Sequence, residues 1–83
     1  MWTFPERLLP HYFFDIDDGR HHVRDERGRV FADQAAAVSE ALDLLRTLRD
    51  VHGLQHRPGI AAIVVRDDKG SSVFEGSVDC DGD

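Results

Sequence analysis

A single amphipathic stretch near the middle of this 83-residue chain limits the folds that the chain can adopt. Apolar side chains recur there at steps of three and four residues, as on one face of a helix: Val38, Ala41, Leu42, Leu45, Leu48 and Val51. Asp33 directly precedes the stretch, where its carboxylate can accept hydrogen bonds from the free N–H groups of the first turn. We therefore expect one helix that begins after Asp33, ends near Val51 and is stopped by Gly53.

Two short β-prone segments precede this helix and two follow it. His11–Ile16 is aromatic, and Arg20–Arg24 returns from it after a turn of Asp-Asp-Gly. Ile60–Arg66 is rich in β-branched residues, and a second turn of Asp and Gly separates it from Ser72–Val78. The order predicts an α+β fold, β-β-α-β-β, in which an antiparallel sheet of about four strands is covered on one face by the amphipathic helix.

The length of the chain allows one hydrophobic core. We expect an N-terminal arm at residues 1–10, a single α+β domain at 11–78 and an acidic tail at 79–83. Cys80 is the only cysteine, so no disulfide can form within the chain, which fits a reducing compartment. No apolar run approaches the roughly 20 residues of a membrane span, and the N-terminus lacks the pattern of a signal peptide. We expect a cytoplasmic protein without a membrane partner.

Charge and aromatic residues bear on the partners. A net charge of −6 argues against nucleic acid, because phosphate binding needs clustered lysine and arginine. Alternation along the first strand places Phe13 on the face opposite Phe14, so one helix cannot cover every aromatic side chain. Trp2 and Phe4 add apolar surface in the arm, which either packs on the sheet or a second copy or is frayed. We expect self-association, most simply a homodimer, through Trp2, Phe4 and Phe13.

Candidate chemistry is sparse in this sequence. His21 and His22 are adjacent on a predicted strand and point to opposite faces, so they cannot chelate one ion. His52 and His56 have helical spacing, but Gly53 is expected to end the helix between them. The context of an activated nucleophile is missing around Ser71, Ser72 and Cys80. The aspartates of the turns are expected to bond their own backbone. We expect no catalytic residue, no metal site and no cofactor.

A series of short motifs runs along the chain in a fixed order: Tyr12-Phe13-Phe14, Asp18-Gly19, Asp25-Glu26 with Gly28, Asp33 with Ala35-Ala36, Glu40-Ala41-Leu42, and Val65-Arg66-Asp67 with Gly70. With these motifs, the segment His11–Val78 resembles a family of small proteobacterial proteins known only as a domain of unknown function. Residues 1–9 depart from the pattern of that family. The resemblance implies a bacterial source and a fold, but no reaction.

A fainter resemblance is to the partial ribonuclease-H-like domain of HicB-type antitoxins. It rests on the order strand, Asp-Gly turn, strand, helix, strand, and on Asp33–Leu42 as the start of the helix. The Leu-Pro-Gly-Cys stretch and the C-terminal DNA-binding segment of those antitoxins are missing. The resemblance implies a protein that could mask a toxin but could not bind an operator by itself.

Three functional hypotheses follow. The first is a small non-enzymatic interaction or regulatory domain that self-associates through the uncovered face or the edge of its sheet. The second is a toxin-neutralising, antitoxin-like or small-ligand-binding module whose acidic surface meets a basic protein partner. The third is an enzyme or metalloprotein, which the scattered nucleophiles and histidines disfavour.

Overall fold

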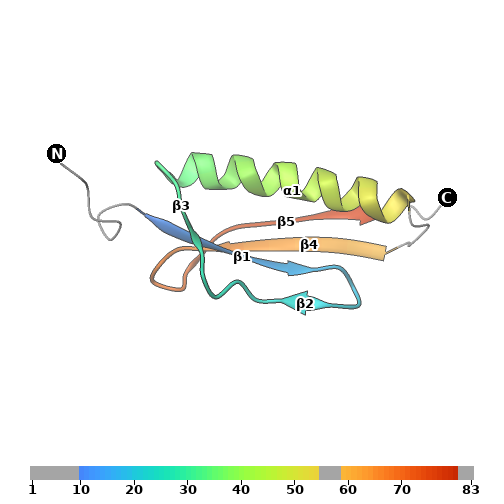
Figure 1. The fold of residues 1–83 in the computed structure, drawn as a ribbon, viewed down its shortest axis with the longest axis horizontal. Helices are drawn as coiled ribbons and strands as arrows, with labels where there is room; N and C mark the ends of the chain where they lie inside the picture. Colours follow the sequence, from blue (N-terminus) through green and yellow to red (C-terminus); the bar gives the residue numbers. More distant parts are fainter. Residues whose placement is uncertain (1–9, 55–58, 81–83) are drawn as a thin grey trace.

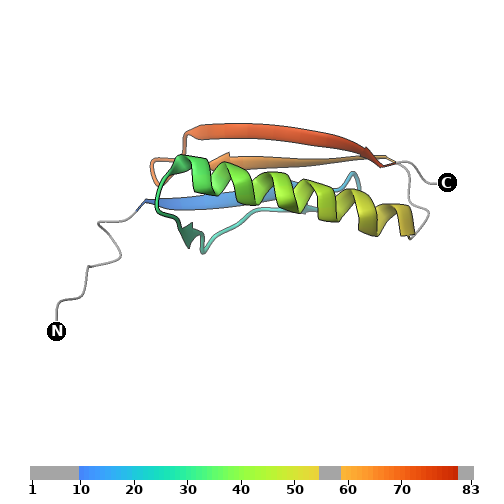
Figure 2. The same cartoon turned by 90° about the horizontal axis from the view of Figure 1, so that it is seen from above.

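The predicted α+β architecture is confirmed by a computed structural model, which describes residues 10–54 and 59–80. The elements in chain order are β1 (His11–Asp17), β2 (His22–Val23), β3 (Arg29–Val30), α1 (Gln34–Leu54), β4 (Gly59–Arg66) and β5 (Ser72–Cys80). The strands form an antiparallel sheet in the order β2-β1-β4-β5, and β3 pairs with the start of β1 (Figure 1). The helix lies on one face of this sheet (Figure 2), and its main contacts are with β5 and β4.

The first hairpin differs from its prediction. Arg20–Arg24 was expected to be a continuous return strand, but only His22 and Val23 pair with β1. One reason is that the Asp18 carboxylate accepts hydrogen bonds from the N–H groups of Arg20 (2.9 Å) and His21, which holds these residues in the turn. The chain then leaves β1 and returns to it as β3, which the sequence did not predict.

The helix begins as predicted and ends later. The Asp33 carboxylate accepts a hydrogen bond from the N–H of Ala36 (2.9 Å), so Asp33 is the N-cap. The helix continues to Leu54, so the prediction that Gly53 stops it is wrong. Glycine within a helix costs about 1 kcal/mol relative to alanine, which a 21-residue helix can tolerate. At the other end of the domain, β5 runs two residues past Val78, the last residue of the predicted domain.

The core lies between α1 and the sheet. Its buried residues are Tyr12, Phe14, Ala37, Ala41, Leu45, Ile63 and Val65. Alanines on the helix allow close approach to the strands, and Leu45 lies directly over Gly76 of β5, where an added Cβ would come within 2.9 Å of the Leu45 Cδ1 atom. The buried stripe is narrower than predicted, because Leu42 and Val51 lie at its margins and are exposed. No helix in the described part of the chain is long and apolar enough to cross a membrane.

Candidate interaction surface

The sheet has one face that α1 does not cover. Side chains alternate along a strand, and the buried residues of β4 point toward α1, so the residues between them point away from it. The strand register carries this face across to β1 and β5. We call it the open face, and its described residues are Phe13, Asp15, Asp17, Ile60, Ala62, Val64, Arg66, Glu75, Ser77 and Asp79.

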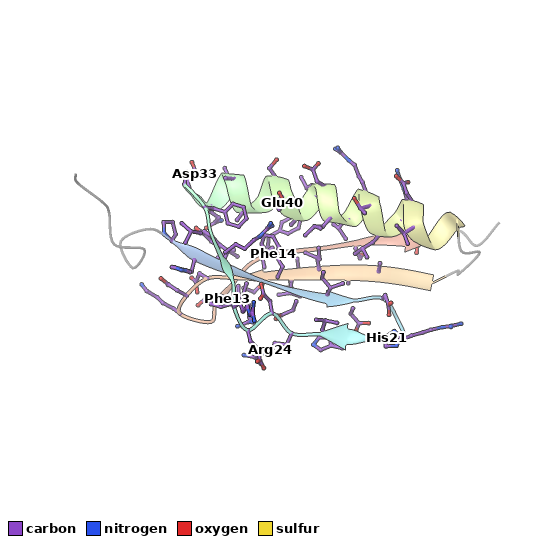
Figure 3. The ribbon with its side chains drawn as sticks, viewed as in Figure 1. Phe13, Phe14, His21, Arg24, Asp33 and Glu40 are labelled. Carbon is purple, nitrogen blue, oxygen red and sulfur yellow. The ribbon has the colours of Figure 1, made fainter. Side chains whose placement is uncertain are left out.

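Phe13 lies on the open face, on the side of β1 opposite Phe14 (Figure 3), as the alternation predicts. Its ring is partly covered by its own chain. The Arg66 guanidinium lies 5.1 Å from the ring centroid, a cation–π arrangement. Gly28 packs against the ring edge, where an added Cβ would come within 2.8 Å of a ring carbon. Trp2 and Phe4, the other residues predicted to self-associate, lie outside the described residues, so only Phe13 is placed.

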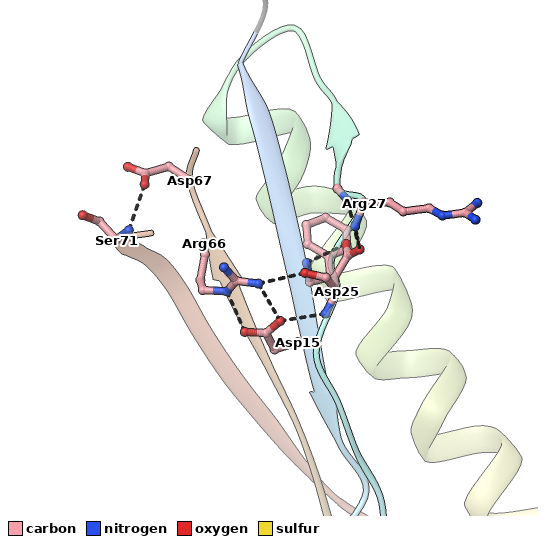
Figure 4. A network of polar contacts seen from close by, with 8 residues as sticks. Asp15, Asp25, Arg27, Arg66, Asp67 and Ser71 are labelled. Carbon is pink, nitrogen blue, oxygen red and sulfur yellow. Dashed lines mark hydrogen bonds and ion pairs between the residues drawn. The ribbon is translucent and has the colours of Figure 1, made fainter. Parts of the chain in front are cut away.

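Arg66 also joins β4 to β1 through a bidentate ion pair (Figure 4). Its Nε donates to Oδ2 of Asp15 at 2.7 Å, and its Nη2 donates to Oδ1 at 3.0 Å. The same Nη2 donates to the backbone carbonyl of Asp25 at 2.9 Å. The side chains of Arg66 and Asp15 are only 16% and 13% exposed. Two parallel hydrogen bonds join the guanidinium to the carboxylate, and both side chains are largely buried. This ion pair is therefore stronger than an ordinary surface ion pair.

Asp25 completes the edge of β1. β1 pairs with β3 at its start and with β2 at its end, and Phe14 lies between these two paired segments. The N–H of Phe14 donates to the Asp25 carboxylate (3.1 Å), which takes the place of a carbonyl group from a neighbouring strand. The other oxygen of this carboxylate accepts from the N–H groups of Arg27 (3.1 Å) and Gly28 (3.0 Å). The N–H of Asp25 in turn donates to Oδ1 of Asp15 (3.0 Å). Asp15, Asp25 and Arg66 therefore form one closed polar network, which we call the Asp15 network.

The network changes the acidity of its members. The hydrogen bond from Arg66 lowers the pKa of Asp15, against the opposing effect of burial. Burial by itself would raise the pKa of Asp25, but the N–H groups that donate to its carboxylate outweigh it, and the pKa is lowered. The hydrogen bond to Asp15 raises the pKa of Arg66. All three groups are charged at neutral pH and bound to one another, so the arrangement suits structural support rather than proton transfer.

Acid should weaken the domain through this network. Carboxylates with a lowered pKa stabilise the fold above the unfolded pKa of about 3.9, and this contribution is lost as pH falls through the lower folded pKa. The free energy of unfolding, measured with urea from neutral pH down to about pH 2, should therefore decrease steeply below about pH 4. In Asp15→Asn the decrease should be shallower, whereas Asp43→Asn, on the exposed side of α1, should match the wild type. Equal acid dependence in all three proteins would contradict this role.

The remaining predicted residues have ordinary surroundings. The turn aspartates bond their own backbone as expected: Asp17 accepts from the N–H of Gly19 (2.8 Å), and Asp67 accepts from those of Lys69 and Ser71 (both 2.9 Å). His21 and His22 are exposed on the first hairpin. Within the part of the chain that the structure describes, no three His, Cys, Asp or Glu side chains gather where they could hold a metal ion. The His52, His56 and Cys80 side chains lie outside that part.

Sequence reasoning missed the Asp15 network. It interpreted Asp15 and Asp25 as turn residues that bond their own backbone, and it assigned no role to Arg66. For Asp15 this interpretation is wrong, because its carboxylate bonds Arg66 and the N–H of Asp25, ten residues away. One signal was available: Asp15 shares a face with Phe13, and Arg66 ends an otherwise apolar strand, so each places a charge next to apolar residues of its own strand. Their pairing, however, depends on β1 lying beside β4, which local patterns do not show.

The outer edge of β5 is the second distinctive surface. β5 is nine residues long and ends the strand order, and no described strand pairs with its outer side. Its one irregularity lies at Val73, because Val65 pairs with Phe74 while Arg66 pairs with Ser72. The strand contains no lysine or proline, the residues that commonly protect a sheet edge. The edge is therefore long and regular from Phe74 onward, and none of the described strands pairs with it.

Together these features define a small α+β domain with one sheet face covered by α1, one open face and one long edge, that of β5, with which no described strand pairs; we call it the free edge. A family model described as Domain of unknown function (DUF6894) matches residues 11–79, and the chain belongs to this family. The resemblance to a family of unknown function that the sequence motifs indicated is thus confirmed. No curated protein and no solved structure matches the chain, and the HicB likeness receives no support from the comparisons.

Proposed function

We propose that this domain is a non-enzymatic interaction or regulatory module that acts by self-association. The observation that carries the proposal is the outer side of β5, a nine-residue edge strand without lysine or proline with which none of the described strands pairs. An edge strand presents a row of N–H and C=O groups that readily pair with another chain. A domain that keeps such an edge open is suited to assembly.

Two further observations support the proposal. The open face carries apolar side chains, of which Ile60 is 57% exposed. The Asp15 network has its carboxylate oxygens occupied by donors of the protein itself, which supports a structural role for it in place of a catalytic one. A cytoplasmic location and a bacterial source belong to the same proposal. The single cysteine supports the first, and the family resemblance supports the second.

Sedimentation equilibrium of the full chain tests self-association. At tens of micromolar protein in dilute buffer, we expect a mass above that of the monomer that falls toward it on dilution. A strict monomer at every concentration would contradict the proposal.

A second candidate function is binding of a basic protein, as in a toxin-neutralising module. Three acidic side chains on the open face are exposed, those of Asp17, Glu75 and Asp79, and the net charge is −6. Such a surface favours a positively charged protein and disfavours nucleic acid. Purification from the native host tests it: a small basic protein should co-elute in a fixed ratio at low salt and dissociate at high salt. Its absence at both salt concentrations would argue against this function.

A further inference from the structure

We infer that two copies of this chain join through their β5 strands, in an antiparallel register centred on Gly76, to form one continuous sheet with both helices on the same face. The inference rests on the proposed function of self-association and specifies the surface that performs it. The occupant of the free edge is a second copy, because the sequence of β5 is complementary to itself in this register. Symmetry, charge and the position of α1 each bear on it.

Symmetry limits the possible registers. A dimer with identical surfaces on both subunits has a two-fold axis. If the axis is perpendicular to the sheet, the helix-covered faces of the two copies lie on the same side of the joined sheet. Residues that lie directly opposite each other on the two β5 strands must then point to the same side. Shifting the pairing of the two β5 strands by one residue would place side chains that point to opposite faces of the sheet directly opposite each other. The axis must therefore pass beside one residue of β5, which then lies opposite its own copy.

Charge favours Gly76 over its two neighbours as that residue. With the axis at Gly76, Glu75 lies opposite the partner's Ser77, and no two acidic side chains are directly opposite. With the axis at Glu75, two glutamates face each other. With the axis at Ser77, Glu75 lies opposite the partner's Asp79, twice in each dimer. Like charges directly opposite each other on neighbouring strands are destabilising, so the register centred on Gly76 is favoured over the registers on either side of it.

The helix-covered side of this register is apolar. Phe74 and Val78 both pack against the core from β5. In this register Phe74 of one copy would lie opposite Val78 of the other copy. Aromatic and β-branched residues are favourable neighbours across strands. The regular segment 74–78 would thus pair with the same segment of the partner, beyond the irregularity at Val73. Gly76, at the axis, leaves room for Leu45 above it.

The position of α1 supports placing both helices on one face. Glu40 forms an ion pair with Arg29 of β3 (3.4 Å), so this flank of the helix faces the β1 side of the sheet. Leu42 lies about 200° around the helix from Glu40 and therefore faces the free edge of β5. It is 44% exposed and lies about one turn from Leu45, which sits over Gly76. A two-fold axis at Gly76 would bring Leu42 toward its copy and bury it.

Charge variants of Ser77 provide the test. Ser77 is exposed on the open face, so charged side chains fit there without disturbing the core. In Ser77→Glu, two new glutamate pairs form across the interface, and in Ser77→Lys, two lysines meet the glutamates at position 75. Each cross-strand pair contributes about 0.2–1 kcal/mol. By sedimentation, the dimer Kd should rise roughly two- to thirty-fold in Ser77→Glu and fall by a similar factor in Ser77→Lys.

Matched variants distinguish an effect at the β5 interface from an effect of the total charge of the protein. Ser39→Glu and Ser39→Lys make the same changes on the solvent side of α1 and should leave the Kd within about two-fold of the wild type. Leu42→Lys, at an exposed position, should raise the Kd while thermal unfolding measured by circular dichroism keeps the wild-type profile at concentrations where both proteins are monomeric.

The outcomes distinguish this inference from the proposed function. A wild-type dimer that responds in opposite directions to Ser77→Glu and Ser77→Lys supports the Gly76 register. A wild-type dimer whose Kd is unchanged by both substitutions overturns the register and leaves self-association intact. A wild-type chain that stays monomeric overturns both. An unchanged Kd in Leu42→Lys overturns the arrangement with both helices on one face.

Discussion

Replacing Leu45 by aspartate should unfold the domain. Leu45 is 4% exposed, lies over Gly76 and belongs to the core cluster. Removing a buried leucine side chain costs about 2–5 kcal/mol, and burial of an unpaired carboxylate adds several more. A domain of this size has about 4–12 kcal/mol of stability in total. Far-ultraviolet circular dichroism of Leu45→Asp should therefore show an unfolded chain at 25 °C.

Glu40→Ala is the matched control on the same helix. Glu40 is part of a half-exposed ion pair with Arg29, so its loss should cost less than about 1 kcal/mol. The variant should keep a cooperative thermal transition within a few degrees of the wild type. Similar behaviour of Leu45→Asp and Glu40→Ala would show that the buried face of α1 is not the one described.

Arg66→Met should cause the second-largest loss of stability. The methionine would leave the Asp15 carboxylate and the Asp25 carbonyl without their main donor, in a place where Asp15 is only 13% exposed. Removing one partner of a buried ion pair is destabilising because the other charge is left uncompensated, and here we expect about 3 kcal/mol. The free energy of unfolding in urea measures it. The loss should shrink in acid, where Asp15 is protonated in both states.

Arg46→Met provides the comparison for Arg66→Met. Arg46 is 71% exposed and pairs with Asp43 one helical turn away at 3.5 Å, a type of contact that contributes about 0.3–0.5 kcal/mol. Its replacement should therefore change the free energy of unfolding by less than about 1 kcal/mol. If both arginine variants lost the same amount, the Asp15 network would be no more than a surface contact.

Local patterns in the sequence predicted the parts of the fold that depend on near neighbours. The cap at Asp33 depends on residues within one helical turn, and it is present. The separation of Phe13 from Phe14 depends only on the alternation of a strand, and it is confirmed. The turn aspartates bond N–H groups two to four residues away, as their sequence context indicated.

The features that sequence reasoning missed depend on distant contacts. Asp15 and Arg66 are 51 positions apart, and they meet only because β4 lies beside β1 in one particular register. Gly53 was expected to stop the helix, but the helix continues through it to Leu54. The open edge of β5 became evident only with the strand order, because an edge strand and a central strand can share the same alternation.

The Asp25 carboxylate has a consequence for how far an assembly can grow. A fibre built by adding strands needs two unpaired sheet edges on each molecule, one for each of its two neighbours. On the β1 side, the described border consists of two-residue strands with the Asp25 side chain between them, already bound to the Phe14 N–H. A dimer joined through β5 would therefore have no second long edge to which a further copy could add its strand, and the assembly would stop at two copies.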